Sequence, residues 1–127
     1  MNRTARQLVG VGIDVESRDA LARYSDEAVR RFAERWLTPA ERTWCAGQSD
    51  VRAAVVACLC GKEAVWKASR GVEGIERIGV ASARGLRRRV RIGDITVVLR
   101  WRLGRRDVLT TAVALQTAHP PARQPAR

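Results

Sequence analysis

Residues 8–17, LVGVGIDVES, alternate between apolar side chains and glycines or acids. The apolar positions are Val9, Val11, Ile13 and Val15. Because successive side chains of a strand point to opposite faces, this alternation predicts a β-strand with one apolar face. The other face carries Gly10 and Gly12 and then Asp14 and Glu16, about 7 Å apart along an extended strand. Two interpretations follow: a half-buried strand whose acids emerge at its solvent-exposed end, or a face with two charges placed at one end for a function.

Two helices are predicted after this strand. Residues 25–36 have helical spacing, with Ser25 as the N-cap and acids in the first turn. Thr38, Pro39 and Glu41 have the spacing of a capping box with proline at the first helical position. A second helix should therefore begin at Pro39.

A third and longer helix is predicted from Val51 to Arg70, capped by Asp50 and closed by Gly71. Beyond it the apolar pattern changes to the period of strands. The expected strands are residues 75–83, 86–92, 95–103 and 108–115. The order of one strand, helices and a run of strands predicts an α+β domain, with an antiparallel sheet packed against the long helix.

The composition is that of a single folded domain. The chain has 127 residues, of which 46% are hydrophobic and 29% charged, which excludes a disordered chain. The apolar run near the N-terminus is short and is interrupted by Asp14, so we expect neither a signal peptide nor a membrane-spanning helix. We expect the domain to cover residues 1–116 and a disordered Pro/Arg-rich tail to cover residues 117–127.

Cysteine usage and charge indicate the setting and the partners. Cys45, Cys58 and Cys60 are odd in number and are not spaced like zinc ligands with the single histidine, so we expect the reducing cytoplasm. The net charge of +11 favours an acidic partner: nucleic acid, anionic membrane, a phosphorylated ligand or an acidic protein. Among 24 basic residues only Lys62 and Lys67 are lysines, which suggests positions that need a compact ammonium group.

The long helix breaks its amphipathic pattern at one place. At 100° per residue, Lys62 and Glu63 straddle the apolar stripe centred near Leu59, and such breaks tend to fall at functional sites. Gly61 beside them costs about 1 kcal/mol relative to alanine in a helix interior, which indicates a close approach. The simpler alternative is an ordinary i,i+4 ion pair between Glu63 and Lys67.

Three acids and two lysines in otherwise apolar elements therefore predict a magnesium and phosphate site. Mg²⁺ prefers one or two carboxylates together with water and phosphate oxygens, and lysine binds phosphate as a point charge. No glycine-rich phosphate-binding motif is present, so the metal and the lysines would hold the phosphate. These five residues are Asp14, Glu16, Lys62, Glu63 and Lys67.

Three motifs, GIDVE (residues 12–16), FAERWLTPAE (32–41) and GKEAVWKA (61–68), together resemble the 4'-phosphopantetheinyl transferase superfamily. The single-domain length resembles its holo-acyl-carrier-protein synthase branch. Each motif alone is weak, but their order and spacing are specific, and the resemblance covers residues 9–71. The paired acids of GIDVE also resemble the larger, two-lobed branch, where both acids help to bind metal.

The resemblance implies an enzyme, a holo-[acyl-carrier-protein] synthase. It would transfer the 4'-phosphopantetheine group of coenzyme A to a serine of an apo acyl or peptidyl carrier protein, releasing adenosine 3',5'-bisphosphate. By motif match, Asp14 and Glu63 would ligate Mg²⁺, with Glu16 as a third ligand or water holder. Lys67 would contact phosphate or the attacking hydroxyl, and Lys62 would flank the diphosphate. Glu63, or a metal-bound water beside it, would be the general base.

The resemblance also implies an acidic carrier protein as partner and a homotrimer with active sites at subunit interfaces. We expect the carrier to dock on Arg30, Arg31 and Arg35, which lie on the helix that includes the matched FAER segment. Arg18 is a further candidate. The alternative for these arginines is a solvated helix face.

Two departures from the family pattern leave other functions open. Cys58 stands where the short branch usually has an arginine, and the late strands lack the serine and histidine often found near the active site. One alternative is a non-catalytic relative that binds a carrier protein or coenzyme A. Another is a nucleic-acid-binding sheet with basic side chains at Arg87, Arg89, Arg91, Arg100 and Arg102.

Overall fold

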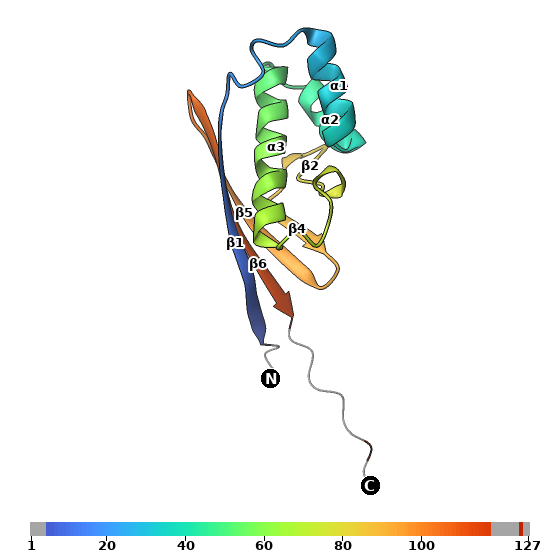
Figure 1. Cartoon of the computed structure of the whole chain (residues 1–127), viewed down its shortest axis with the longest axis vertical. Coiled ribbons are helices and arrows are strands. Elements are labelled where there is room, and N and C mark those ends of the chain that lie inside the picture. Colours follow the sequence, from blue (N-terminus) through green and yellow to red (C-terminus); the bar gives the residue numbers. More distant parts are fainter. Residues whose placement is uncertain (1–4, 118–124, 126–127) are drawn as a thin grey trace.

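The computed structural model describes residues 5–117 and 125, and it shows an α+β fold (Figure 1). Four antiparallel strands form one sheet in the order β1, β6, β5, β4, and the helices lie on one face of it (Figure 1). The predicted fold class, an antiparallel sheet against a long helix, is confirmed. The strands of this sheet are β1 (Arg6–Ser17), β4 (Arg89–Ile92), β5 (Ile95–Leu103) and β6 (Asp107–Thr117).

The long helix α3 (Val51–Ala68) fills the core. It begins as predicted, with the side chain of Asp50 accepting a hydrogen bond from the backbone amide of Ala53. The helix packs along β1, β6 and β5, and 12 of its 18 residues are buried. It ends two residues before the predicted position, where Arg70 and Gly71 turn the chain with positive φ angles.

Two glycines of β1 allow α3 to approach the sheet. A Cβ atom on Gly12 would lie 2.1 Å from the carbonyl oxygen of Ala64, and one on Gly10 would lie 2.5 Å from that of Ala68. The strand is half-buried, as expected, but it is buried through its glycine face. Its apolar face points away from the helices, with exposed fractions of 56–65%. These exposed side chains are Leu8, Val11, Ile13 and Val15. Val9, which was expected on this face, is instead partly buried against the core, because the pairing of β1 with β6 shifts register between Leu8 and Gly10.

The predicted starts of the first two helices are confirmed. Ser25 accepts a backbone hydrogen bond at the start of α1 (Asp26–Trp36). Thr38 and Glu41 form a reciprocal capping box at the start of α2 (Pro39–Ala46). The backbone amide of Thr38 donates to Oε1 of Glu41 at 2.8 Å, and the amide of Glu41 donates to Oγ1 of Thr38 at 3.2 Å.

The strand predicted over residues 75–83 is wrong for most of its length. A short 3-10 helix replaces its beginning, and only its last part pairs, in a separate two-stranded sheet. The backbone amide of Val80 donates to Oε2 of Glu41 at 2.8 Å. The buried carboxylate of Glu41 in α2 therefore accepts the hydrogen bond that a neighbouring strand would accept in a sheet. The short elements of this region are η1 (Ile75–Arg77), β2 (Ala81–Ser82) and β3 (Gly85–Leu86).

The predicted tail over residues 117–127 falls almost entirely outside the described residues. Thr117 belongs to β6 and lies opposite Arg6 of β1, so the sheet extends one residue past the predicted boundary. None of the helices in the described part of the chain combines the length and the hydropathy that crossing a bilayer requires.

Candidate active site

Three carboxylates from two elements meet at one place. Asp14, Glu16 and Glu63 each offer a carboxylate oxygen, and these oxygens all lie within 4.8 Å of one another. Asp14 and Glu16 share one face of β1 because they are two residues apart in a strand. Glu63 reaches them from α3, which lies close to β1 because Gly12 has no side chain. The predicted acidic residues are therefore brought together by the packing of α3 on β1.

Lys67 adds a positive charge to this cluster. Its Nζ atom donates to Oδ1 of Asp14 at 3.1 Å and to the carbonyl oxygen of Ile13 at 3.0 Å. The Lys67 side chain is 46% exposed, whereas that of Asp14 is 8% exposed. The second carboxylate oxygen of Asp14, Oδ2, is buried and has no hydrogen-bond partner within the described residues. Because an unpartnered buried carboxylate oxygen is costly, this atom fits a ligand of a cation.

Burial and mutual repulsion raise the pKa values of two of the acids. The pKa of Glu63 rises to about 7, first because of burial and then through hydrogen bonding and repulsion with Asp14, with Glu16 adding to the effect. Burial, followed by repulsion from Asp14, also raises the pKa of Glu16. The ammonium group of Lys67 opposes both shifts. A divalent cation would relieve this repulsion and favour the ionised carboxylates.

The chemistry of the donor set fits Mg²⁺. This ion takes hard oxygen ligands, usually one or two carboxylates with water and phosphate oxygens. Asp14, Glu16 and Glu63 are the residues that could hold it, and Glu16 and Glu63 are only partly buried, so the cluster is open to solvent and to a phosphate ligand. Lys67 pairs with Asp14 beside these acids, and its ammonium group could bind a phosphate oxygen.

Lys62 lies elsewhere, and its predicted role beside the diphosphate needs correction. The side chain is fully buried, and its Nζ atom donates to Oε1 of Glu41 at 2.7 Å and to the carbonyl oxygen of Ile78 at 2.6 Å. Glu41 is equally buried. Neighbouring residues of a helix point about 100° apart, so Lys62 faces the core while Glu63 faces the acids of β1. Lys62 is a structural residue that joins α3 to α2 and to the segment before β2.

The amphipathic interpretation of α3 is also corrected. Leu59, the expected centre of a buried stripe, is only partly buried, and Trp66 is 41% exposed. Both lie within about 60° of Glu63 around the helix axis. Other parts of the protein cover most of the circumference of α3, and the carboxylate of Glu63 lies on the least covered side.

The close approach expected at Gly61 comes from the protein's own core. A Cβ atom on Gly61 would lie 2.0 Å from the indole ring of Trp101 in β5. The indole Nε1 atom donates to the carbonyl oxygen of Arg87 at 2.8 Å, which fixes the ring over the helix. Gly61 therefore serves the packing of α3 on the sheet.

The sequence of the chain matches a known protein family. A family model described as the 4'-phosphopantetheinyl transferase superfamily matches residues 10–118. The chain belongs to this superfamily. The match spans both elements of the carboxylate cluster, β1 and α3, and the strands that complete the sheet. Among curated proteins, none matches the chain.

Solved structures of acyl-carrier-protein synthases share the fold of this superfamily member. The Mycobacterium tuberculosis enzyme is 28% identical, with a TM-score of 0.63 over 88% of this chain and 100% of the other. The Neisseria meningitidis enzyme is 25% identical, with a TM-score of 0.69 over 85% and 98%. The Bacillus anthracis enzyme, solved in complex with CoA (3',5'-ADP), is 24% identical, with a TM-score of 0.67 over 89% and 100%. This chain thus has the fold of the holo-acyl-carrier-protein synthases and belongs to a superfamily of enzymes.

Three of the arginines predicted to bind a carrier lie on the exposed side of α1. Arg31 and Arg30 both pair with Glu27, at 2.9 and 3.8 Å, and the guanidinium group of Arg35 lies 5.0 Å from the centre of the Trp36 ring. Their exposure fits a docking surface, and their ion pairs along the helix equally fit a solvated face. Carrier docking on α1 stays a prediction.

Arg18 lies apart from these three residues. Its Nη1 atom donates to the carbonyl oxygen of Gly104 at 3.1 Å, and Nη2 lies 3.8 Å from Oδ2 of Asp50. These contacts tie the chain after β1 to the turn before β6 and to the start of α3. A role of Arg18 in carrier binding stays a prediction.

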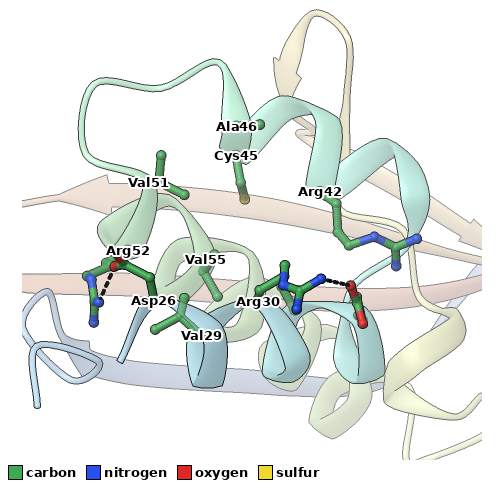
Figure 2. Close-up of a pocket in the computed structure, with 11 residues that line it drawn as sticks. Asp26, Val29, Arg30, Arg42, Cys45, Ala46, Val51, Arg52 and Val55 are labelled. Atoms are coloured by element: carbon green, nitrogen blue, oxygen red, sulfur yellow. Dashed lines mark hydrogen bonds and ion pairs between the residues drawn. The ribbon is translucent and has the colours of Figure 1, made fainter. Parts of the chain in front are cut away.

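A separate cavity of about 370 Å³ lies between α1, α2 and the first half of α3 (Figure 2). Its walls are mainly apolar, and three arginines and two acids are also among the residues that line it. None of the carboxylates of the candidate active site lines it. The apolar walls include Val29, Ala33, Cys45, Val51 and Val55.

Proposed function

We propose that this protein transfers the 4'-phosphopantetheine group of coenzyme A to a serine of an apo acyl or peptidyl carrier protein, with Mg²⁺ as cofactor. The observation that carries the proposal is the cluster of Asp14, Glu16 and Glu63 with Lys67 beside it. Membership of the superfamily supports the reaction class. The structure of the Bacillus anthracis relative with coenzyme A supports the donor.

In the proposed reaction, the serine oxygen of the carrier attacks the β-phosphorus of coenzyme A. The phosphoanhydride bond breaks, and adenosine 3',5'-bisphosphate leaves. Asp14, Glu16 and Glu63 would hold Mg²⁺, which when bound neutralises charge on the diphosphate oxygens. The ammonium group of Lys67 lies beside Asp14 and would bind a phosphate oxygen.

Glu63 is the residue that we assign to proton transfer. Without metal, burial and the neighbouring acids raise the pKa of its carboxyl to about 7. A bound cation would keep this carboxylate ionised and so able to accept a proton. One oxygen of its carboxylate could hold the metal while the other accepts the proton of the serine hydroxyl. Glu63 is only partly buried, so a hydroxyl from a docked carrier can reach it.

The carrier protein would be acidic and would meet α1. The net charge of +11 favours such a partner through long-range attraction. Arg30, Arg31 and Arg35 are the exposed basic side chains of α1 that would contact it. The three free cysteines fit the reducing cytoplasm as the compartment.

We also propose that the protein is a homotrimer in which other copies cover the outer face of the sheet. This face carries a row of exposed apolar side chains on β1, and Val113 of β6, directly opposite Val11, is also exposed. A contiguous apolar surface of this kind usually marks an interface. Two of the three acids of the candidate active site, Asp14 and Glu16, lie on the same strand, β1, so a neighbouring copy would approach the site.

Intact-protein mass spectrometry of apo carrier proteins tests the proposed function. Each carrier is incubated with this protein, coenzyme A and Mg²⁺, and a parallel sample contains EDTA. A phosphopantetheine mass gain that EDTA removes is the expected result. No gain on any carrier, with coenzyme A still bound in calorimetry, would instead favour a non-catalytic relative.

A further inference from the structure

Two of the three cysteines form a buried pair between helices. The Sγ atom of Cys45 in α2 lies 3.7 Å from the Sγ atom of Cys58 in α3. The third thiol has other partners: Cys60 donates to the carbonyl oxygen of Asp14 at 3.1 Å and accepts from the hydroxyl of Thr110 at 3.4 Å. The chain therefore contains one close dithiol and one separate thiol that serves as its internal control.

The cavity of Figure 2 gives a route to one sulfur of the pair. Cys45 lines it, and its sulfur points from α2 toward the interior. Cys58 does not line the cavity and is fully buried. At about 370 Å³ and with mainly apolar walls, the cavity has room for a small neutral disulfide.

We propose that Cys45 and Cys58 are a thiol-modification site, at which a low-molecular-weight disulfide entering the cavity reacts first with Cys45 and is then displaced by Cys58. The pKa values of the two thiols favour the same order of reaction as their access to the cavity. The hydrogen bond with the Cys58 thiol lowers the pKa of Cys45, whereas that hydrogen bond and burial raise the pKa of Cys58. The thiolate is the attacking species in such exchange, so the order of reaction follows.

The exchange proceeds in two balanced steps. The Cys45 thiolate attacks one sulfur of the reagent RSSR, forming a mixed disulfide and releasing RS⁻, which takes up a proton. Cys58 then attacks Sγ of Cys45, loses its own proton, and displaces the second RS⁻, which leaves as RSH. In sum, the protein dithiol is oxidised by two electrons and one RSSR is reduced to two RSH.

The new bond would link α2 to α3. The two sulfurs must approach from 3.7 Å to about 2 Å, which a change of side-chain rotamer and a small movement of the helices would provide. Cys58 precedes Glu63 on α3 by five residues, so the linked position lies about 7.5 Å along the helix from the candidate active site.

The test uses bis(2-hydroxyethyl) disulfide on the full-length, reduced protein without denaturant. After reaction the sample is denatured, its free thiols are alkylated, and intact masses and digests are recorded. The wild type should show one alkylated thiol, no reagent adduct and a Cys45–Cys58 disulfide. Three alkylated thiols, or a disulfide that includes Cys60, would overturn the proposal. This readout does not depend on transferase activity, so it is separate from the test of the proposed function.

Serine variants test the order of the two steps. Cys58→Ser should retain one reagent adduct on Cys45, because no second thiol can displace it. Cys45→Ser should retain none in the same time, and an adduct on Cys58 at an equal rate would overturn the assigned order. Cys60→Ser is the matched control and should form the internal disulfide like the wild type. Thermal melts confirm that each variant is folded. The wild-type result does not depend on the variants.

Discussion

The Nζ atom of Lys67 lies 3.1 Å from Oδ1 of Asp14, and this contact joins the last turns of α3 to the middle of β1. The two residues are far apart in sequence, and the helix packs close enough for the contact because β1 carries glycine where a side chain would meet the helix backbone. One carboxylate oxygen of Asp14 thus has a lysine partner, while the other is buried without a hydrogen-bond partner in the described part of the chain.

Removing a carboxylate should abolish transfer while leaving the fold intact. Asp14→Ala and Glu63→Ala each delete an oxygen ligand from the cluster, and we expect the rate of carrier modification to fall by about 100-fold or more. The measurement is the rate of phosphopantetheine mass gain, with circular dichroism to confirm the fold. Glu76→Ala, at an exposed position of η1 outside both α1 and the carboxylate cluster, is the control and should keep near-normal activity. An active double variant of Asp14 and Glu63 would refute the mechanism.

The pH dependence of stability should report the ionisation of Glu63. Because its folded-state pKa is raised from 4.5 to about 7, the native state holds a proton that the unfolded chain releases in that range. Without metal, its contribution to stability is present below pH 4.5 and is lost as the pH rises through about 7. Urea unfolding in EDTA should therefore show wild type losing stability relative to Glu63→Gln across this window. A difference that does not change with pH would contradict the assignment.

The two lysines should behave oppositely when each is replaced by methionine. Lys62→Met leaves the buried carboxylate of Glu41 without its cation, and we expect unfolding free energy to fall by about 3–5 kcal/mol. Lys67→Met removes a lysine that is 46% exposed and leaves Oδ1 of the largely buried Asp14 without its cation, so we expect a smaller loss of about 1–3 kcal/mol. The folded Lys67→Met variant should lose transfer activity, whereas the folded Lys62→Met variant should keep it. Denaturant unfolding and single-turnover mass spectrometry separate the two effects.

Alanine at Gly12 should disturb the packing that builds the site. The new Cβ would lie 2.1 Å from a backbone oxygen of α3, so the helix must move away from β1. We expect a loss of stability of about 1–3 kcal/mol and weaker Mg²⁺ binding in calorimetry. Gly79→Ala is the matched control, because its Cβ would meet nothing within 4 Å. Equal effects of the two substitutions would show that the close approach is unimportant.

A charge on the outer face of the sheet should dissociate the proposed trimer. Val11→Asp places a carboxylate among exposed apolar side chains and opposite Val113, without touching the glycine face that packs on α3. Sedimentation velocity should show the wild type as a trimer and the variant as a monomer. Val72→Asp, at a similarly exposed valine outside the sheet, is the control and should leave the assembly unchanged. A monomeric wild type would refute the proposed assembly.

Local patterns in the sequence determined much of this protein. The caps at Ser25, Thr38 and Asp50 fixed where the helices begin, because a cap depends only on residues within one turn. Alternation predicted β1 and placed Asp14 and Glu16 on one face. The three motifs identified the superfamily, and the acids of two of them do lie together.

Only the tertiary structure decided which face of each element is buried. Alternation shows that β1 has two faces, but the burial of the glycine face follows from the contact with α3, which no local pattern encodes. The same holds for Lys62: its lysine type suggested a phosphate ligand, whereas its partner is Glu41, a residue already explained as a helix cap. A strand or helix has a periodicity of its own, but whether a given side chain meets solvent, substrate or core depends on the elements that pack against it, and these come from distant parts of the chain.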